Sequence, residues 1–141
     1  MDFETDREII ETARIVAKHW ITYSRYKCFG EFSDLEQENR FLIYKCARAE
    51  PIVAWEAIKC VIEGFDANEI LCRSDTEAQE IVQHTAGPLS ELLERHGPEM
   101  IAKVIQDAEK DGRIRWALSC LDRGNLSQNI WDKLRLAGNR T

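Results

Sequence analysis

The chain has 141 residues, of which 44% are hydrophobic and 31% charged, and this length fits one domain that can bury its own core. Its three prolines and seven glycines are too few for a linker or a disordered protein, and no apolar run approaches the roughly 20 residues of a membrane span. The formal net charge of −6 argues against a nucleic-acid-binding domain, because such domains carry a basic footprint.

Helical patterns fill the first half of the chain. The motif Thr5-x-x-Glu8 predicts a capping box at the start of a first helix, and apolar residues at helical spacing extend that helix to about Cys28. Ser33 or Asp34 is expected to begin a second helix. Pro51 suits the first turn of a third, and Gly64 is expected to end the third as its C-terminal cap.

The second half continues in the same way. A short helix is expected over 67–72, and Asp75-x-x-Ala78 predicts the start of another. Gly87-Pro88 and Gly97-Pro98 each place a helix-ending glycine before a helix-starting proline. A last helix is expected to begin at Asn125 or Ser127, whereas strand patterns are too short to predict a sheet.

The predicted fold class is therefore all-α, a single compact domain over 1–141 built of antiparallel helix hairpins. HEAT-like stacking is compatible with this pattern, although the sequence shows no fixed repeat period. Three parts differ in charge. An N-terminal helix occupies 1–30, an acidic helical body occupies 31–111, and basic C-terminal helices occupy 112–141.

The cysteine pattern favours a reduced compartment. There are five cysteines, an odd number, and none forms a C-x-x-C pair, which argues against a disulfide framework and a zinc site. We expect them to be mostly buried thiols. The acidic N-terminus also lacks the basic segment of a secretory signal. A cytoplasmic protein is therefore expected. The five are Cys28, Cys46, Cys60, Cys72 and Cys120.

Charge and aromatic residues together suggest a protein partner. The body over 31–111 carries 18 acidic and eight basic residues, whereas 112–141 carries two acidic and six basic ones. Aromatic residues near the end of the first helix adjoin an acidic run, and Tyr is a frequent anchor of binding interfaces. Packing of the following loop is the competing explanation of these aromatics. The candidate partner-binding residues are Tyr23, Tyr26, Glu31, Asp34, Glu36 and Glu38.

The segment from Ala86 to Gly97 is the most distinctive motif of the chain. A structural interpretation explains it, with both glycines in left-handed cap conformations, both prolines at helix starts and the leucines buried. A His–carboxylate pair, His84 or His96 with Glu91 or Glu94, is the alternative, because such pairs act as general acid and base. The structural motif comprises Gly87, Pro88, Leu89, Leu92, Leu93 and Gly97.

This segment, Gly-Pro-Leu-x-x-Leu-Leu-x-x-His-Gly in outline, resembles the signature of an uncharacterised family of small bacterial helical domains. An upstream Trp55-x-x-Ile58, Ile101-x-x-x-Ile105 and a late Ile130-Trp131 extend the resemblance over roughly the last two-thirds of the chain. The resemblance implies a helical bacterial domain and supplies no catalytic residues, cofactor or activity.

Three functions stay open at this stage. The first is a non-enzymatic immunity or antitoxin-like inhibitor that docks an acidic face on a basic nuclease toxin. The second is a general helical interaction or scaffold module. The third is a small enzyme using the His–carboxylate pair, against which stands the absence of phosphate-loop, dinucleotide, zinc-protease and nucleophile-elbow motifs. No cofactor, metal, nucleic acid or membrane partner is expected, and the oligomeric state is left open.

Overall fold

The computed structural model describes residues 3–28 and 34–138, and within them the side chains of 6–24 and 42–138. The described part of the chain forms eight α-helices and no β-strand, so the all-α prediction is confirmed. The helices are α1 (Phe3–Cys28), α2 (Asp34–Ala49), α3 (Pro51–Glu63), α4 (Ala67–Leu71), α5 (Glu77–His84), α6 (Ala86–Lys110), α7 (Gly112–Ser119) and α8 (Gln128–Gly138).

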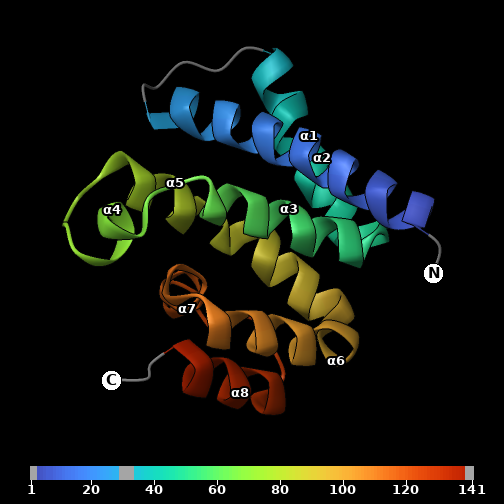
Figure 1. The fold of residues 1–141 in the computed structure, drawn as a ribbon. Helices are drawn as coiled ribbons and strands as arrows, with labels where there is room; N and C mark the ends of the chain where they lie inside the picture. The colour runs from blue at the N-terminus through green and yellow to red at the C-terminus, as the bar shows by residue number, and fades with distance from the viewer. Residues whose placement is uncertain (1–2, 29–33, 139–141) are drawn as a thin grey trace.

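The helices are arranged around α3, as Figure 1 shows. Helices α1 and α2 pack on one side of α3 and on each other, and α6 packs on the other side. Helices α7 and α8 pack on α6 and close the opposite end of the molecule, while α4 and α5 project to one side. None of the described helices is long and apolar enough to cross a membrane.

Helix α3 is apolar on almost every face. Its residues Ala54, Trp55, Ala57 and Ile58 are fully buried, as are Val61 and Ile62. Fully burying each large apolar side chain contributes about 1.5–3 kcal/mol, so this helix supplies much of the hydrophobic stabilisation. Pro51 occupies the first turn of α3 as predicted.

Two predicted helix starts are wrong by a few residues. Helix α1 begins at Phe3 rather than after Thr5, so Thr5 is not its cap. The cap of α5 is Thr76, not Asp75, and Thr76 forms a capping box with Gln79. Asp75 instead has a φ of 58°, a left-handed backbone conformation, and forms the turn directly before the cap residue Thr76. Ser127 precedes α8, and its hydroxyl accepts the backbone N–H of Ile130, as one of the two predicted starts requires.

The two motif glycines do not adopt the left-handed conformation predicted for them. Both lie within α6, and among the described glycines only Gly124 has a positive φ. Each lies instead at a close approach to a side chain. A Cβ on Gly87 would collide with the hydroxyl of Tyr44, and one on Gly97 would lie 3.3 Å from Ile130. Sequence patterns cannot show such tertiary contacts.

The leucines of the motif behave as predicted. Leu89, Leu92 and Leu93 are buried, and α5 ends before the motif begins. The predicted break at Gly97-Pro98 is present as a kink within α6, where His96 has non-helical backbone angles. A proline removes one helical hydrogen bond and crowds the preceding turn, and the two parts of α6 accordingly diverge in Figure 1.

The described cysteines are all free thiols. Cys46 is buried, and Cys60 and Cys120 are half-buried; burial raises the pKa of all three thiols. Cys72 is exposed, so the prediction of a buried thiol is wrong there, because α4 turns this residue toward solvent. The side chain of Cys28 lies outside the described residues.

The close approach at Gly87 can be tested by substitution. We expect Gly87→Ala to lower the free energy of unfolding by about 1–3 kcal/mol, the usual cost of overpacking, because its Cβ displaces the Tyr44 hydroxyl. The cost should shrink in a Tyr44→Phe background, measured as a double-mutant cycle by urea denaturation. Equal costs in the two backgrounds would contradict this explanation.

Candidate functional site

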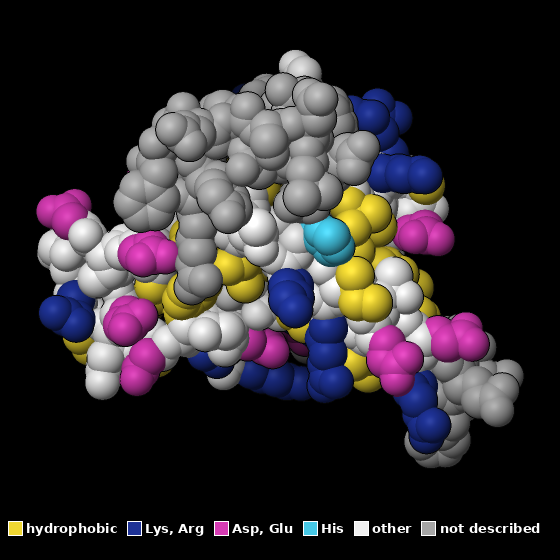
Figure 2. Space-filling view, turned by 90° about the horizontal axis from the view of Figure 1, so that it is seen from above, with side chains coloured by type: hydrophobic (Ala, Val, Ile, Leu, Met, Phe, Trp, Pro, Cys, Tyr) yellow, Lys and Arg dark blue, Asp and Glu magenta, His cyan; other side chains and the backbone are white. Residues whose placement is uncertain are grey.

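Acidic side chains gather at the side of the molecule formed by the end of α3 and by α4 and α5. We call residues 63–80 the acidic end. Its six acidic residues are opposed by the single base Arg73, and Figure 2 shows acidic side chains clustered on this side. Five of the six are exposed and Glu69 is half-buried. The six are Glu63, Asp66, Glu69, Asp75, Glu77 and Glu80.

Hydrogen bonds within the acidic end fix the loop between α4 and α5. The side chain of Gln79 donates to the carbonyls of Ile70 at 2.8 Å and Arg73 at 2.7 Å. The Thr76 hydroxyl donates to the carbonyl of Glu69 at 2.8 Å and also caps α5. Two side chains therefore join the end of α4 to the start of α5, and the intervening carboxylate of Asp75 is held on an ordered loop.

A second anchor joins the acidic end to the body of the protein. The guanidinium of Arg113, on α7, donates to the carbonyls of Glu63 at 3.3 Å and Phe65 at 2.8 Å, just after α3. Asp111 accepts the same guanidinium at 2.8 Å. Hydrogen bonding from Arg113 lowers the pKa of Asp111, and the Asp111 carboxylate raises that of Arg113. This arginine is thus engaged structurally, and its pairing limits how far it offsets the negative charge of the acidic end.

The acidic end surrounds an open hollow of about 580 Å³. Its walls are mostly polar, and the residues that line it include the acidic Glu69, Asp75 and Glu77 and the basic Arg73. Within the described part of the chain, no three His, Cys, Asp or Glu side chains are grouped so as to hold a metal ion. A hollow with several carboxylates can receive a cationic side chain of a partner, because opposite charges attract across a partly desolvated surface.

Of the predicted partner-binding residues, only Tyr23 has a described side chain. It is 4% exposed and packs on Trp20 with ring centroids 5.2 Å apart, so Tyr23 belongs to the core and the prediction of a surface anchor is wrong. The three-residue spacing of aromatic residues that suggested a binding role for Tyr23 is also the spacing of the buried face of α1. Glu31 and the side chains of Tyr26, Asp34, Glu36 and Glu38 lie outside the described residues.

Three of the four predicted His–carboxylate candidates, Glu91, Glu94 and His96, are held by other groups. Glu91 accepts Arg48 at 3.0 Å and Arg95 at 2.6 Å, and these hydrogen bonds lower its pKa. Glu94 accepts the backbone N–H of Asn125 at 3.3 Å. The His96 ring nitrogen Nε2 lies 2.8 Å from the carbonyl of Arg48. These contacts join α2, and the loop before α8, to α6. The three side chains therefore have structural partners.

Sequence reasoning missed a polar network between α3 and α6. The indole nitrogen of the fully buried Trp55 donates to Asp107 at 2.7 Å, and Lys59 lies 3.1 Å from the same carboxylate oxygen and 3.0 Å from Glu56. Burial alone would raise the pKa of Asp107, but hydrogen bonds from Trp55 and Lys59 and the nearby charge of Lys103 lower it. Burial likewise opposes the charge of Lys59, yet its two carboxylate partners raise its pKa.

A comparison with protein-family models identifies the family of this chain. A family model described as a family of unknown function, DUF6869, matches residues 37–141. The chain belongs to this family. The match supports the resemblance to an uncharacterised family, includes α3 to α8 and the whole acidic end, and leaves α1 outside. No curated protein and no solved structure matches the chain.

The polar network should make stability depend on pH in a defined direction. Because the pKa of Asp107 is lower in the folded protein than in the unfolded chain, its charge stabilises the fold above pH about 4, and this contribution is lost as the pH falls through the lowered value. We expect Asp107→Ala to cost about 2 kcal/mol at neutral pH, since it leaves the buried Trp55 N–H unpaired.

The measurement is urea denaturation between pH 2 and pH 7, a range chosen around the ordinary carboxyl pKa of about 4. Asp107→Asn keeps an acceptor for Trp55 and should flatten the acid side of the stability profile. Glu99→Gln, an exposed carboxylate on the same helix, is the matched control. If Asp107→Asn and Glu99→Gln give the same dependence of stability on pH, the Asp107 carboxylate does not set the acid stability of the protein.

Proposed function

We propose that this protein is a non-enzymatic protein-binding domain whose acidic end docks on a basic surface of a partner protein. The observation that carries the proposal is the six-to-one ratio of acidic to basic residues over 63–80. Three of the six carboxylates, Glu69, Asp75 and Glu77, line a hollow of about 580 Å³. Complementary charge of this kind steers a partner into an encounter and fixes its orientation.

The order of the acidic end supports the same proposal. An interface whose loops are already fixed loses less conformational entropy on binding than one that must be ordered. Gln79 and Thr76 hold the loop between α4 and α5, and Arg113 holds the segment between α3 and α4. The carboxylates are therefore presented on a preorganised surface.

The most concrete form of the proposal is an immunity or antitoxin-like inhibitor in the bacterial cytoplasm, with a basic nuclease toxin as the partner. A nuclease cleft is lined by cations that bind phosphates, and an array of carboxylates competes for the same cations. A general helical interaction or scaffold module is the second candidate, favoured by the exposed apolar residues Ile15 and Leu136, which charge complementarity does not use.

The first test is whether a nuclease domain is encoded beside the gene for this protein and, where one is, whether the two proteins associate. We expect binding to inhibit the nuclease. The association rate should fall steeply between about 0.1 and 1 M salt, because the Debye length shrinks from about 10 Å to about 3 Å. Neither binding nor inhibition, or an association rate indifferent to salt, would contradict the inhibitor proposal.

Charge reversal locates the surface. Glu63→Lys with Glu80→Lys should slow association by about tenfold or more and change dissociation less, as rim charges do. Glu8→Lys with Glu11→Lys changes the net charge by the same amount on the exposed face of α1 and is the matched control. Equal slowing by the two pairs would show a general charge effect and count against the acidic end as the docking surface.

A further inference from the structure

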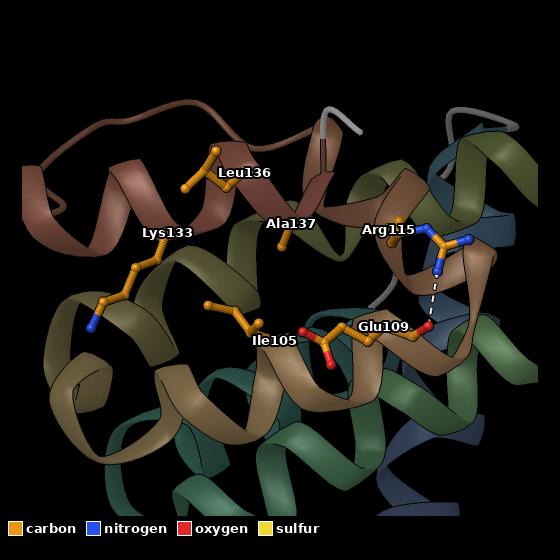
Figure 3. A pocket seen from close by; sticks show the side chains of 6 residues that line it. All are labelled: Ile105, Glu109, Arg115, Lys133, Leu136 and Ala137. Atoms are coloured by element: carbon orange, nitrogen blue, oxygen red, sulfur yellow. Dashed lines mark hydrogen bonds between the residues drawn. The ribbon is translucent and has the colours of Figure 1, made fainter. Parts of the chain in front are cut away.

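A second and smaller hollow lies between α6, α7 and α8, away from the residues of the acidic end. Its volume is about 160 Å³, and a cavity of about 150 Å³ holds a benzene-sized group. Figure 3 shows the side chains that line it, which are Ile105, Glu109, Arg115, Lys133, Leu136 and Ala137. The hollow therefore has room for one aliphatic side chain.

An exposed leucine stands beside this apolar hollow. Leu136 is 71% exposed, the largest value among the described large hydrophobic residues that face solvent. Ile105 is half-buried and Ala137 buried, so the inner wall of the hollow is apolar. The exposed side chain of Leu136, beside it, makes few contacts within its own chain. One surface thus offers both a protruding aliphatic group and a recess that fits such a group.

The rim also carries two opposite charges. In Figure 3, Lys133 and Glu109 lie on either side of Ile105. Both are exposed, and neither side chain enters an ion pair or hydrogen bond in the part of the chain that the structure describes. The nearby Arg115, by contrast, has hydrogen-bond partners within the chain: its guanidinium donates to the carbonyls of Ala108 at 2.8 Å and Glu109 at 3.3 Å.

A twofold rotation makes such a surface complementary to itself. In an isologous dimer the same patch of each copy faces that of the other. A protruding side chain of one copy can then enter the hollow of the other, and a basic side chain can meet an acidic one, and each contact occurs twice. We propose that this face binds a second copy of the same chain. Leu136 enters the partner's hollow against Ile105 and Ala137, and Lys133 pairs with Glu109 of the partner subunit.

The charges distinguish this occupant from others. A basic partner of the kind proposed for the acidic end is disfavoured here, because residues 112–141 carry six basic and two acidic residues. A small anionic ligand would meet the carboxylate of Glu109 beside Lys133. A surface that carries the same two charges in reversed order satisfies both, and a second copy of the chain has that arrangement. The inference does not depend on the proposed function.

The first experiment measures the molar mass of the full chain by sedimentation equilibrium from about 1 μM to about 1 mM, the range in which small interfaces dissociate. We expect a monomer–dimer equilibrium for the natural sequence. Leu136→Gln should weaken the dimer about tenfold or more, as loss of an apolar anchor does, whereas Ile15→Gln, a comparably exposed residue on α1, should leave it unchanged.

The second experiment uses the two charges. Lys133→Glu and Glu109→Lys should each weaken self-association, because each sets like charges opposite each other. An equimolar mixture of the two variants should form a heterodimer more readily than either variant forms a homodimer, since both contacts are then again between opposite charges. A natural chain that stays monomeric throughout, a Leu136→Gln variant that dimerises normally, or a mixture that does not associate would each overturn the proposal.

Discussion

The burial of α3 between α1 and α2 on one side and α6 on the other is the constraint on which the rest of the structure depends. A helix that is apolar on nearly all faces is stable only when neighbours cover it. Its polar groups must then find partners inside the protein, because an unpaired buried donor is costly. The Trp55 indole and the Lys59 ammonium both meet this requirement at the carboxylate of Asp107, which fixes α6 against α3.

The position of α3 in turn determines the two surfaces to which we assign functions. The acidic end begins where α3 ends, and Arg113 on α7 holds its first carbonyls. The face around Leu136 lies on α8, which packs on α6 and α7. Different helices therefore carry a surface rich in carboxylates and a surface with one charge of each sign. A dimer formed through the second would display two copies of the first.

Local sequence patterns predicted the helices well, because a helix depends on residues three or four positions apart. Pro51 at the start of α3 and the buried Leu89, Leu92 and Leu93 of α6 are properties of this kind. The reason for Gly87 could not be predicted, because the Tyr44 hydroxyl that a Cβ would strike lies 43 residues earlier in the chain. The Trp55–Asp107 hydrogen bond spans 52 residues and was invisible for the same reason.

The candidate site was harder to predict than the fold. The excess of acids in 31–111 is a property of composition. The placement of Glu69, Asp75 and Glu77 around one hollow depends instead on the turn at Asp75 and on the hydrogen bonds of Gln79 and Thr76. Aromatic spacing drew attention to Tyr23, although the same spacing follows the buried face of α1. Whether an aromatic residue anchors a partner or a core depends on which neighbours cover it, and this is decided by tertiary packing.

The most direct measurement of the central constraint is native-state hydrogen exchange of the backbone amides. If α3 is the helix on which the others depend, the amides of Val61 and Ile62 should be among the slowest to exchange and should do so only through global unfolding. Their exchange free energy should then equal the free energy of unfolding from urea denaturation. Exchange of these amides by local opening, while α1 and α6 stay protected, would contradict the account.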